Sequence, residues 1–201
     1  VTPKKKNLPK KHNSPDVLKE LFFQTNKDMP RKLSKSAARF EMPLNIKFME
    51  SIVFEYLSEF VWISRQRKQF YKKTFLKYIC KDEFDEAGDP LPSDIERRIP
   101  VLHFRKAVQE VLGFYSTDEV IEKLCDIVEI DNYTELNFRS WCGILAFAER
   151  LALKNSQDTD SCDELEKSDF DSLEQRFGVL DLSPNMKFVF EIIRKGHVGR
   201  I

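Results

Sequence analysis

The sequence predicts an all-α domain, and three observations support this prediction. Apolar residues recur at helical spacing through most of the 201-residue chain. Neither glycine nor proline interrupts residues 44–79, so long helices can form there. The tetrad at 102–105 (Leu-His-Phe-Arg) recurs 34 residues later at 136–139 (Leu-Asn-Phe-Arg), and each copy begins an apolar helical pattern.

The composition is that of a chain able to bury a core. Hydrophobic residues make up 41% of it and include 17 Phe, while 33 basic and 33 acidic side chains cancel. The net charge therefore favours no class of partner. The longest apolar run of the repeat region, 144–148, is far too short for a bilayer, and Val1 is followed by lysines instead of a signal-peptide core, so we expect no membrane span.

The four cysteines lack the spacing of a metal or redox motif. They are at least 17 residues apart, without a C-x-x-C pair, which argues against zinc and leads us to expect no cofactor. Cys125 and Cys142 fall within helical apolar patterns, where a reduced cysteine acts as a small hydrophobe. A reducing compartment is the expectation.

The first 43 residues divide into a polar arm and a segment with one short predicted helix. Residues 1–13 are predicted to be a basic flexible arm, and a solvated tail is the favoured interpretation, with binding to anionic surfaces or a nuclear address as the alternatives. Residues 14–43 are predicted as a short helix, capped by Ser14 and Pro15, followed by a linker. The candidates for contact with an anionic surface are Lys4, Lys5, Lys6, Lys10 and Lys11.

The predicted helical core, 44–153, begins with a segment that is apolar on most sides. Residues 44–63 are predicted to form a helix that other elements must cover. Residues 65–79 are predicted to be helical with apolar residues on one side only. The two segments form either one long helix or two helices with a break near Ser64. In 65–79 the aromatic residues share one face and the lysines turn outward. Phe70 and Tyr71 stand next to lysines in the sequence, and aromatic rings interleaved with lysines are also suited to stacking on bases. A basic nucleic-acid-binding helical protein is therefore an alternative.

The repeats continue this core. An acidic, proline-rich loop at 81–99 precedes a helix at about 103–112 with Gly113 as its stop. Ser116 and Glu119 form a capping box for a helix that runs to Val128. After a short loop at 131–135, the last helix of the pair runs from Asn137 to about 153.

Two such helix–loop–helix units in tandem resemble an EF-hand pair, over about residues 61–153. The resemblance implies a short β-bridge between the two loops, with Leu102 and Leu136 as its anchors, and an apolar groove for partners. The expected fold is thus all-α, with an EF-hand-like paired helix–loop–helix core and additional flanking helices.

Both loops depart from the EF-hand pattern at positions that calcium binding needs, so we expect that calcium binding is lost. In the register set by the anchors, Thr134 stands where the loop needs glycine, Ser140 stands where it needs a bidentate glutamate, and Lys106 takes that place in the first copy. We therefore expect no metal site. A calcium-responsive EF-hand regulator remains an alternative, with Glu129 and Asp131 as ligands in this register, or Glu83 and Asp85 in a register built on Gly88.

Two segments follow the core. Residues 154–182 are predicted as an acidic flexible linker, because acidic side chains are concentrated there. Residues 183–196 are predicted as a C-terminal amphipathic helix that starts at Ser183-Pro184 and closes at Gly196.

No pattern in the chain predicts catalysis. The histidines are His12, His103 and His197, and His103 aligns with Asn137 of the second copy, which favours a structural role. The phosphate-binding, zinc-protease and nucleophile-elbow motifs are missing. We expect a protein that is not an enzyme and has no small-molecule substrate.

The remaining function is a protein-interaction module, an adaptor or scaffold that acts without calcium. Its partner would be an amphipathic helix or a cytoskeletal component, and the 44–63 and 186–193 segments could themselves fill the groove. The resemblance implies a cytoplasmic setting in a cytoskeletal or ciliary assembly, with the nucleus as the alternative. The partner-binding candidates are Phe48, Phe54, Trp62, Phe70, Trp141, Met186, Val189, Phe190 and Ile193.

Overall fold

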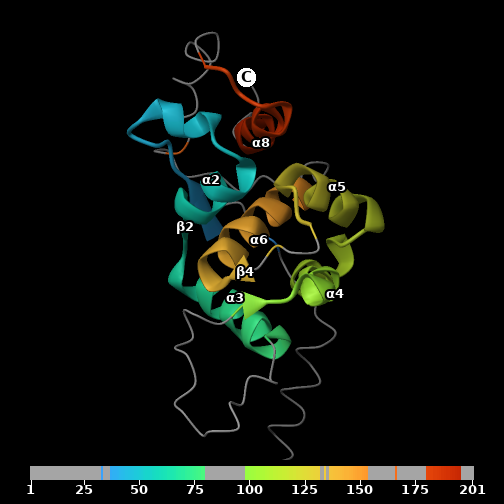
Figure 1. Ribbon diagram of the computed structural model, residues 1–201. Helices are drawn as coiled ribbons and strands as arrows, with labels where there is room; N and C mark the ends of the chain where they lie inside the picture. The colour runs from blue at the N-terminus through green and yellow to red at the C-terminus, as the bar shows by residue number, and fades with distance from the viewer. Residues whose placement is uncertain are drawn as a thin grey trace, which may run out of the picture. The chain divides into compact units, whose positions relative to one another are not determined.

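The computed structural model describes residues 33, 37–79, 98–131, 134, 136–153, 166 and 180–195. Contacts divide the chain into residues 1–31 and 32–201, and every described residue belongs to the second unit. The described part is mostly helical, as expected, and contains two antiparallel two-stranded sheets, of which the pair β1–β2 was not expected (Figure 1). The basic arm, the helix predicted after Ser14 and most of the acidic linker lie outside the described residues.

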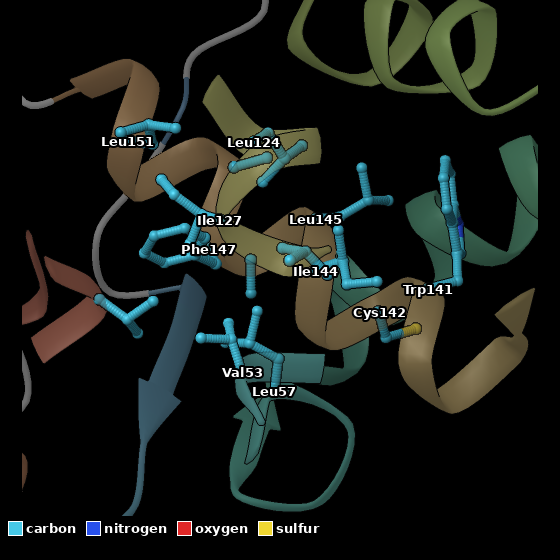
Figure 2. Packing of buried hydrophobic residues seen from close by; sticks show 14 of the residues in the cluster. Val53, Leu57, Leu124, Ile127, Trp141, Cys142, Ile144, Leu145, Phe147 and Leu151 are labelled. Atoms are coloured by element: carbon cyan, nitrogen blue, oxygen red, sulfur yellow. The ribbon is translucent and has the colours of Figure 1, made fainter. Parts of the chain in front are cut away.

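Helix α6 (Phe138–Ala152) is the centre of this unit. It contacts α2 (Val53–Glu59), α3 (Arg65–Tyr78), α4 (Val101–Leu112), α5 (Asp118–Val128) and α8 (Pro184–Lys195). Residues 140–151 are all buried, including the charged Glu149 and Arg150, so other elements surround this helix over most of its length. Figure 2 shows side chains of α2, α5 and α6 packed together in this core.

The apolar segment 44–63 is not the helix that its composition suggests. It forms the 3-10 helix η2 (Ile46–Glu50), the short α2 and the strand β2 (Val61–Ile63). Strand β2 pairs antiparallel with β1 (Ala38–Phe40). The β-branched Val61 and Ile63 favour this extended state, and Ser64 then caps α3 by accepting a hydrogen bond from Arg67 N.

The pairing also extends the domain toward the N-terminus. Leu33, Ala38 and Phe40, which we placed in a linker, are buried in the core. At Ala38–Phe40 the structure has a strand that we did not predict, because a three-residue strand carries too little pattern to be recognised without its partner.

The two repeats have the same element order. Helices α3 and α4 flank β3 (Arg98–Ile99), and α5 and α6 flank β4 (Leu136–Asn137). Strands β3 and β4 pair antiparallel, which confirms the short β-bridge, but Leu136 faces Ile99 instead of Leu102. The Leu102 anchor is wrong: α4 already begins at Val101, and Leu102 in its first turn is 83% exposed.

The caps of the later helices are close to those expected. Thr117, not Ser116, caps α5, and its Oγ1 accepts a hydrogen bond from Val120 N (3.3 Å). The Ser116 hydroxyl instead donates to the carbonyl oxygen of Gly113, which ends α4 with a φ of 57°. Helix α8 starts as predicted, with Met186 N donating to Ser183 Oγ (3.1 Å).

Helix α8 is part of the core. It packs on α2, α5 and α6, and the Phe190 ring meets the Tyr56 ring edge-on at 5.2 Å. The chain therefore covers its own central helix with a C-terminal segment. No helix of the described part combines the length and the hydropathy that crossing a bilayer demands.

Candidate partner-binding pocket

A surface pocket of about 480 Å³ lies between β2 and the beginning of α6. Its walls come from the end of α2, from β2, from the first turns of α3, and from β4 and α6. The lining residues are Glu59, Val61, Trp62, Ile63, Lys68, Asn137, Phe138, Arg139 and Cys142.

The backbone of β2 has one edge toward β1 and one edge toward this pocket. Glu41 N donates to Phe60 O (2.7 Å), at one end of the strand pair. At the other end, Ser64 N donates to Ala37 O (2.9 Å). Because backbone direction alternates along a strand, Trp62 also turns its N–H and C=O toward β1.

Val61 and Ile63 consequently turn their backbone groups away from β1. The far edge of β1 has a partner, because Arg150 Nη2 donates to Ala38 O (3.2 Å). Within the described residues, β2 pairs with β1 alone. Val61 and Ile63 also line the pocket, so the second edge of β2 borders it.

Trp62 is an exposed aromatic residue in the lining of the pocket. Its side chain is 50% exposed, although tryptophan is among the residues that gain most from burial. It lies on the face of the sheet opposite the half-buried Val61 and Ile63, and the Arg39 guanidinium sits 5.7 Å from the centre of its ring. An exposed indole beside a cavity is a typical anchor for a partner.

The pocket carries more positive than negative charge. Lys68 and Arg139 are exposed cations in its lining, against the single carboxylate of Glu59. The α6 N-terminus also lies here, where the Asn137 side chain accepts from Ser140 N (2.9 Å), and the helix dipole adds positive potential. The cavity therefore suits an acidic ligand.

Cys142 closes the inner wall of the pocket without acting as a nucleophile. The side chain is nearly buried, and burial raises the pKa of its thiol to about 12, although the charge of Lys68 acts in the opposite direction. Since only the thiolate attacks electrophiles, the protonated thiol at neutral pH is a poor catalytic group.

A buried polar cluster holds α3, and with it Lys68, against α6. Glu149 Oε1 accepts hydrogen bonds from Arg67 Nε (2.8 Å) and Tyr71 Oη (2.8 Å). Burial raises the pKa of Glu149, although both donors act to lower it. Burial alone would lower the pKa of Arg67, but interactions with Glu149 and Tyr71 raise it overall. The cluster links α3 to α6 through buried hydrogen bonds and an ion pair.

The structure separates the predicted partner-binding residues into two groups. Trp62 reaches the pocket, Phe48 is 37% exposed beside Phe60, and Phe54 and Phe70 are partly buried. The other candidates are in the core and cannot contact a partner in this fold, because the chain uses them to cover its own helices: Trp141, Met186, Val189, Phe190 and Ile193.

The predicted calcium ligands of the second loop have other partners. Glu129, with a left-handed backbone (φ 58°), accepts a hydrogen bond from Asn185 Nδ2 of α8 (3.0 Å). Asp131 Oδ1 accepts one from the Thr134 hydroxyl (2.6 Å). Glu83 and Asp85 lie outside the described residues, among which no group of three or more metal-ligating side chains occurs.

Sequence reasoning missed most of this site. The strand itself was signalled by three consecutive residues of high β-propensity, Val61, Trp62 and Ile63, but we assigned them to a helix. Lys68 and Arg139 are 71 positions apart, and no sequence pattern brings them together. The lysine candidates of the arm lie outside the described residues.

Comparison with known proteins adds no assignment. The chain matches no family model, and neither a curated protein nor a solved structure is significantly similar to it.

Proposed function

We propose that this chain is a non-catalytic protein-interaction module, an adaptor or scaffold, and that the pocket beside β2 holds its partner. The observation that carries the proposal is the half-exposed Trp62 at a cavity that also borders a strand edge. Apolar lining, an aromatic anchor and a few polar groups at the rim are the usual components of a recognition site.

We further propose that α3–β3–α4 and α5–β4–α6 form an EF-hand-like pair that does not bind calcium. The repeated order of elements and the pairing of β3 with β4 support this assignment. The hydrogen bonds of Glu129 and Asp131 support the loss of calcium, because both carboxylates already have partners within the protein. Such a module acts constitutively, and a cytoplasmic cytoskeletal or ciliary assembly is the setting that the likeness suggests.

The apolar surface expected for a foreign amphipathic helix is covered by the chain itself. Helix α8 presents Met186, Val189 and Phe190 to α2, α5 and α6, so the chain itself occupies the apolar surface that a foreign helix would need. We therefore assign the partner to the pocket beside β2.

The test of the interaction function is a peptide selection against the whole chain. Phage-displayed random dodecamers are enriched on the wild-type protein, and the winners are synthesised and titrated against Trp62→Ala. Because Trp62 lines the pocket, we expect affinity to fall at least tenfold. The matched control is Phe114→Ala, which removes an aromatic ring that is 93% exposed and outside the pocket lining. An empty selection, or equal losses in both variants, would refute the proposed function.

A calorimetric titration with calcium tests the second part of the proposal. We expect no heat of binding at micromolar calcium and the same melting temperature in calcium and in chelator. A binding isotherm with a raised melting temperature would instead identify the domain as a calcium sensor.

A further inference from the structure

We propose that the pocket binds its partner as an added β-strand: an acidic, extended peptide segment that pairs with the second edge of β2. This proposal rests on the proposed interaction function and specifies the partner's chemistry and conformation. It requires a strand edge that can accept hydrogen bonds, room beside it, and a charge that selects the occupant.

The backbone groups at the second edge of β2 point in the direction that an added strand requires. The backbone N–H and C=O groups of Val61 and Ile63 point away from β1, as the register of the sheet shows. A peptide strand about 4.8 Å from β2 would bond to these two residues at alternate positions. Val61 and Ile63 also line the pocket, so cavity space adjoins these two residues.

The lining has the required charge. Lys68 and Arg139 and the positive end of α6 face the cavity, and Glu59 is the one carboxylate of its lining. An acidic side chain of the peptide would gain from all three positive sources. Val61, Ile63 and Phe138 offer apolar contacts to the residues between the acidic ones.

A helical occupant does not fit these features. An α-helix uses its own backbone groups internally, so it would leave the edge of β2 unsatisfied while excluding water from it. An extended segment that alternates acidic and β-branched residues satisfies the edge, the charge and the apolar lining together.

The decisive probe is a fluorescein-labelled octapeptide of alternating Val and Glu, with two N-methylated forms. One form is methylated on alternate residues, and the other on the residues between them. Because only every second N–H of an added strand faces β2, one form should bind at least tenfold more weakly than the unmodified peptide while the other keeps its affinity. Equal binding of both forms would overturn the added strand.

The electrostatic part has a matched pair of protein variants. Lys68→Glu reverses a charge in the pocket, whereas Lys73→Glu reverses an exposed charge on the same helix outside the lining. We expect Lys68→Glu alone to weaken peptide binding at least tenfold at 50 mM salt, with both variants melting like the wild type. Equal effects would refute recognition of an acidic segment by this pocket, as would displacement of the peptide by an equal concentration of single-stranded DNA.

The two proposals fail in different ways. If selected peptides depend on Trp62 but both methylated forms bind equally, the interaction function stands and the added strand is wrong. If no selected peptide depends on Trp62, the interaction function itself is wrong.

Discussion

Gly143 allows α2 to lie directly against the backbone of α6. A Cβ atom at this position would stand 1.8 Å from the carbonyl oxygen of Leu57, so no side chain fits between the helices. Next to it the hydroxyls of Ser58 and Ser140 are 2.9 Å apart across the same contact. Small residues on both helices therefore set the close approach of α2, and β2 follows directly from α2.

Gly143→Ala tests this contact, because the contact determines whether the substitution raises or lowers the free energy of unfolding. In an exposed helix, replacing glycine by alanine stabilises by about 1 kcal/mol. Here the clash is with backbone, so we expect the free energy of unfolding in urea to fall by about 3 kcal/mol or more. An unchanged or raised midpoint would contradict the packing of α2 on α6.

Cys142 makes the free energy of unfolding depend on pH in the alkaline range. Unfolded cysteine loses its proton near pH 9, whereas burial in the folded protein raises the pKa of Cys142 to about 12. Between these values the folded state binds more protons, so stability falls as the pH rises. We expect the wild type to lose about 2–3 kcal/mol more than Cys142→Ala between pH 9 and 11, measured by urea unfolding. Parallel pH profiles would show that the thiol is solvated.

At the scale of elements, the β-bridge joins the two helix–loop–helix units. Each strand has two residues, and the apolar residues that face one another, Ile99 and Leu136, are fully buried. The hydrogen bonds of such a short bridge contribute little to its stability, which comes mainly from the burial of these side chains.

Alanine substitutions distinguish this register from the one expected from the tetrads. Ile99→Ala and Leu136→Ala each remove a buried side chain, and we expect each to lower the free energy of unfolding by about 2–5 kcal/mol. Phe138→Ala should cost less than Leu136→Ala, since Phe138 is only partly buried. Leu102→Ala is the control, because an 83% exposed leucine should change stability by less than about 0.5 kcal/mol. A large effect at Leu102 with none at Ile99 would restore the expected register.

At the scale of the domain, α6 gathers segments from both ends of the described chain. Arg150 contacts β1 through Ala38 O and forms a buried ion pair with Glu166 (3.0 Å), which belongs to the segment predicted as a flexible linker. For Glu166 that prediction is wrong, because its side chain is fully buried. Separate stretches of sequence thus share one core, with α8 as its cover.

Phe190→Ala measures how far α8 belongs to this core. The ring is 1% exposed and packs edge-on against Tyr56, so we expect a loss of about 3–5 kcal/mol in a single cooperative unfolding transition. Lys187→Ala, an exposed position on the same helix, should leave the transition unchanged. A normal transition for Phe190→Ala would mean that α8 is an appendage.

Periodicity was sufficient to predict the helices from α3 onward, because each shows a clear apolar face or a cap. The helix over 103–112, the final helix of the repeats and the start at Ser183 all occur close to their expected bounds. The partition of 65–79 into a buried aromatic face and exposed lysines was also predicted, with Tyr71 and Phe75 inside and Lys72 and Lys73 outside. These features are local, and the signal for each lies within a few turns of sequence.

The sequence by itself therefore determined that helices form, where most of them begin, and that a helix–loop–helix pattern occurs twice. The short bridge between the two units was expected from the EF-hand resemblance. Only the tertiary structure decided that 44–63 breaks into η2, α2 and β2, that Ile99 faces Leu136, and that β2 keeps one edge beside a positively charged pocket. The physical reason is that strand pairing, ion pairs and cavity walls are made by residues far apart in the chain. Their energies appear only when the helices have packed and brought those residues together.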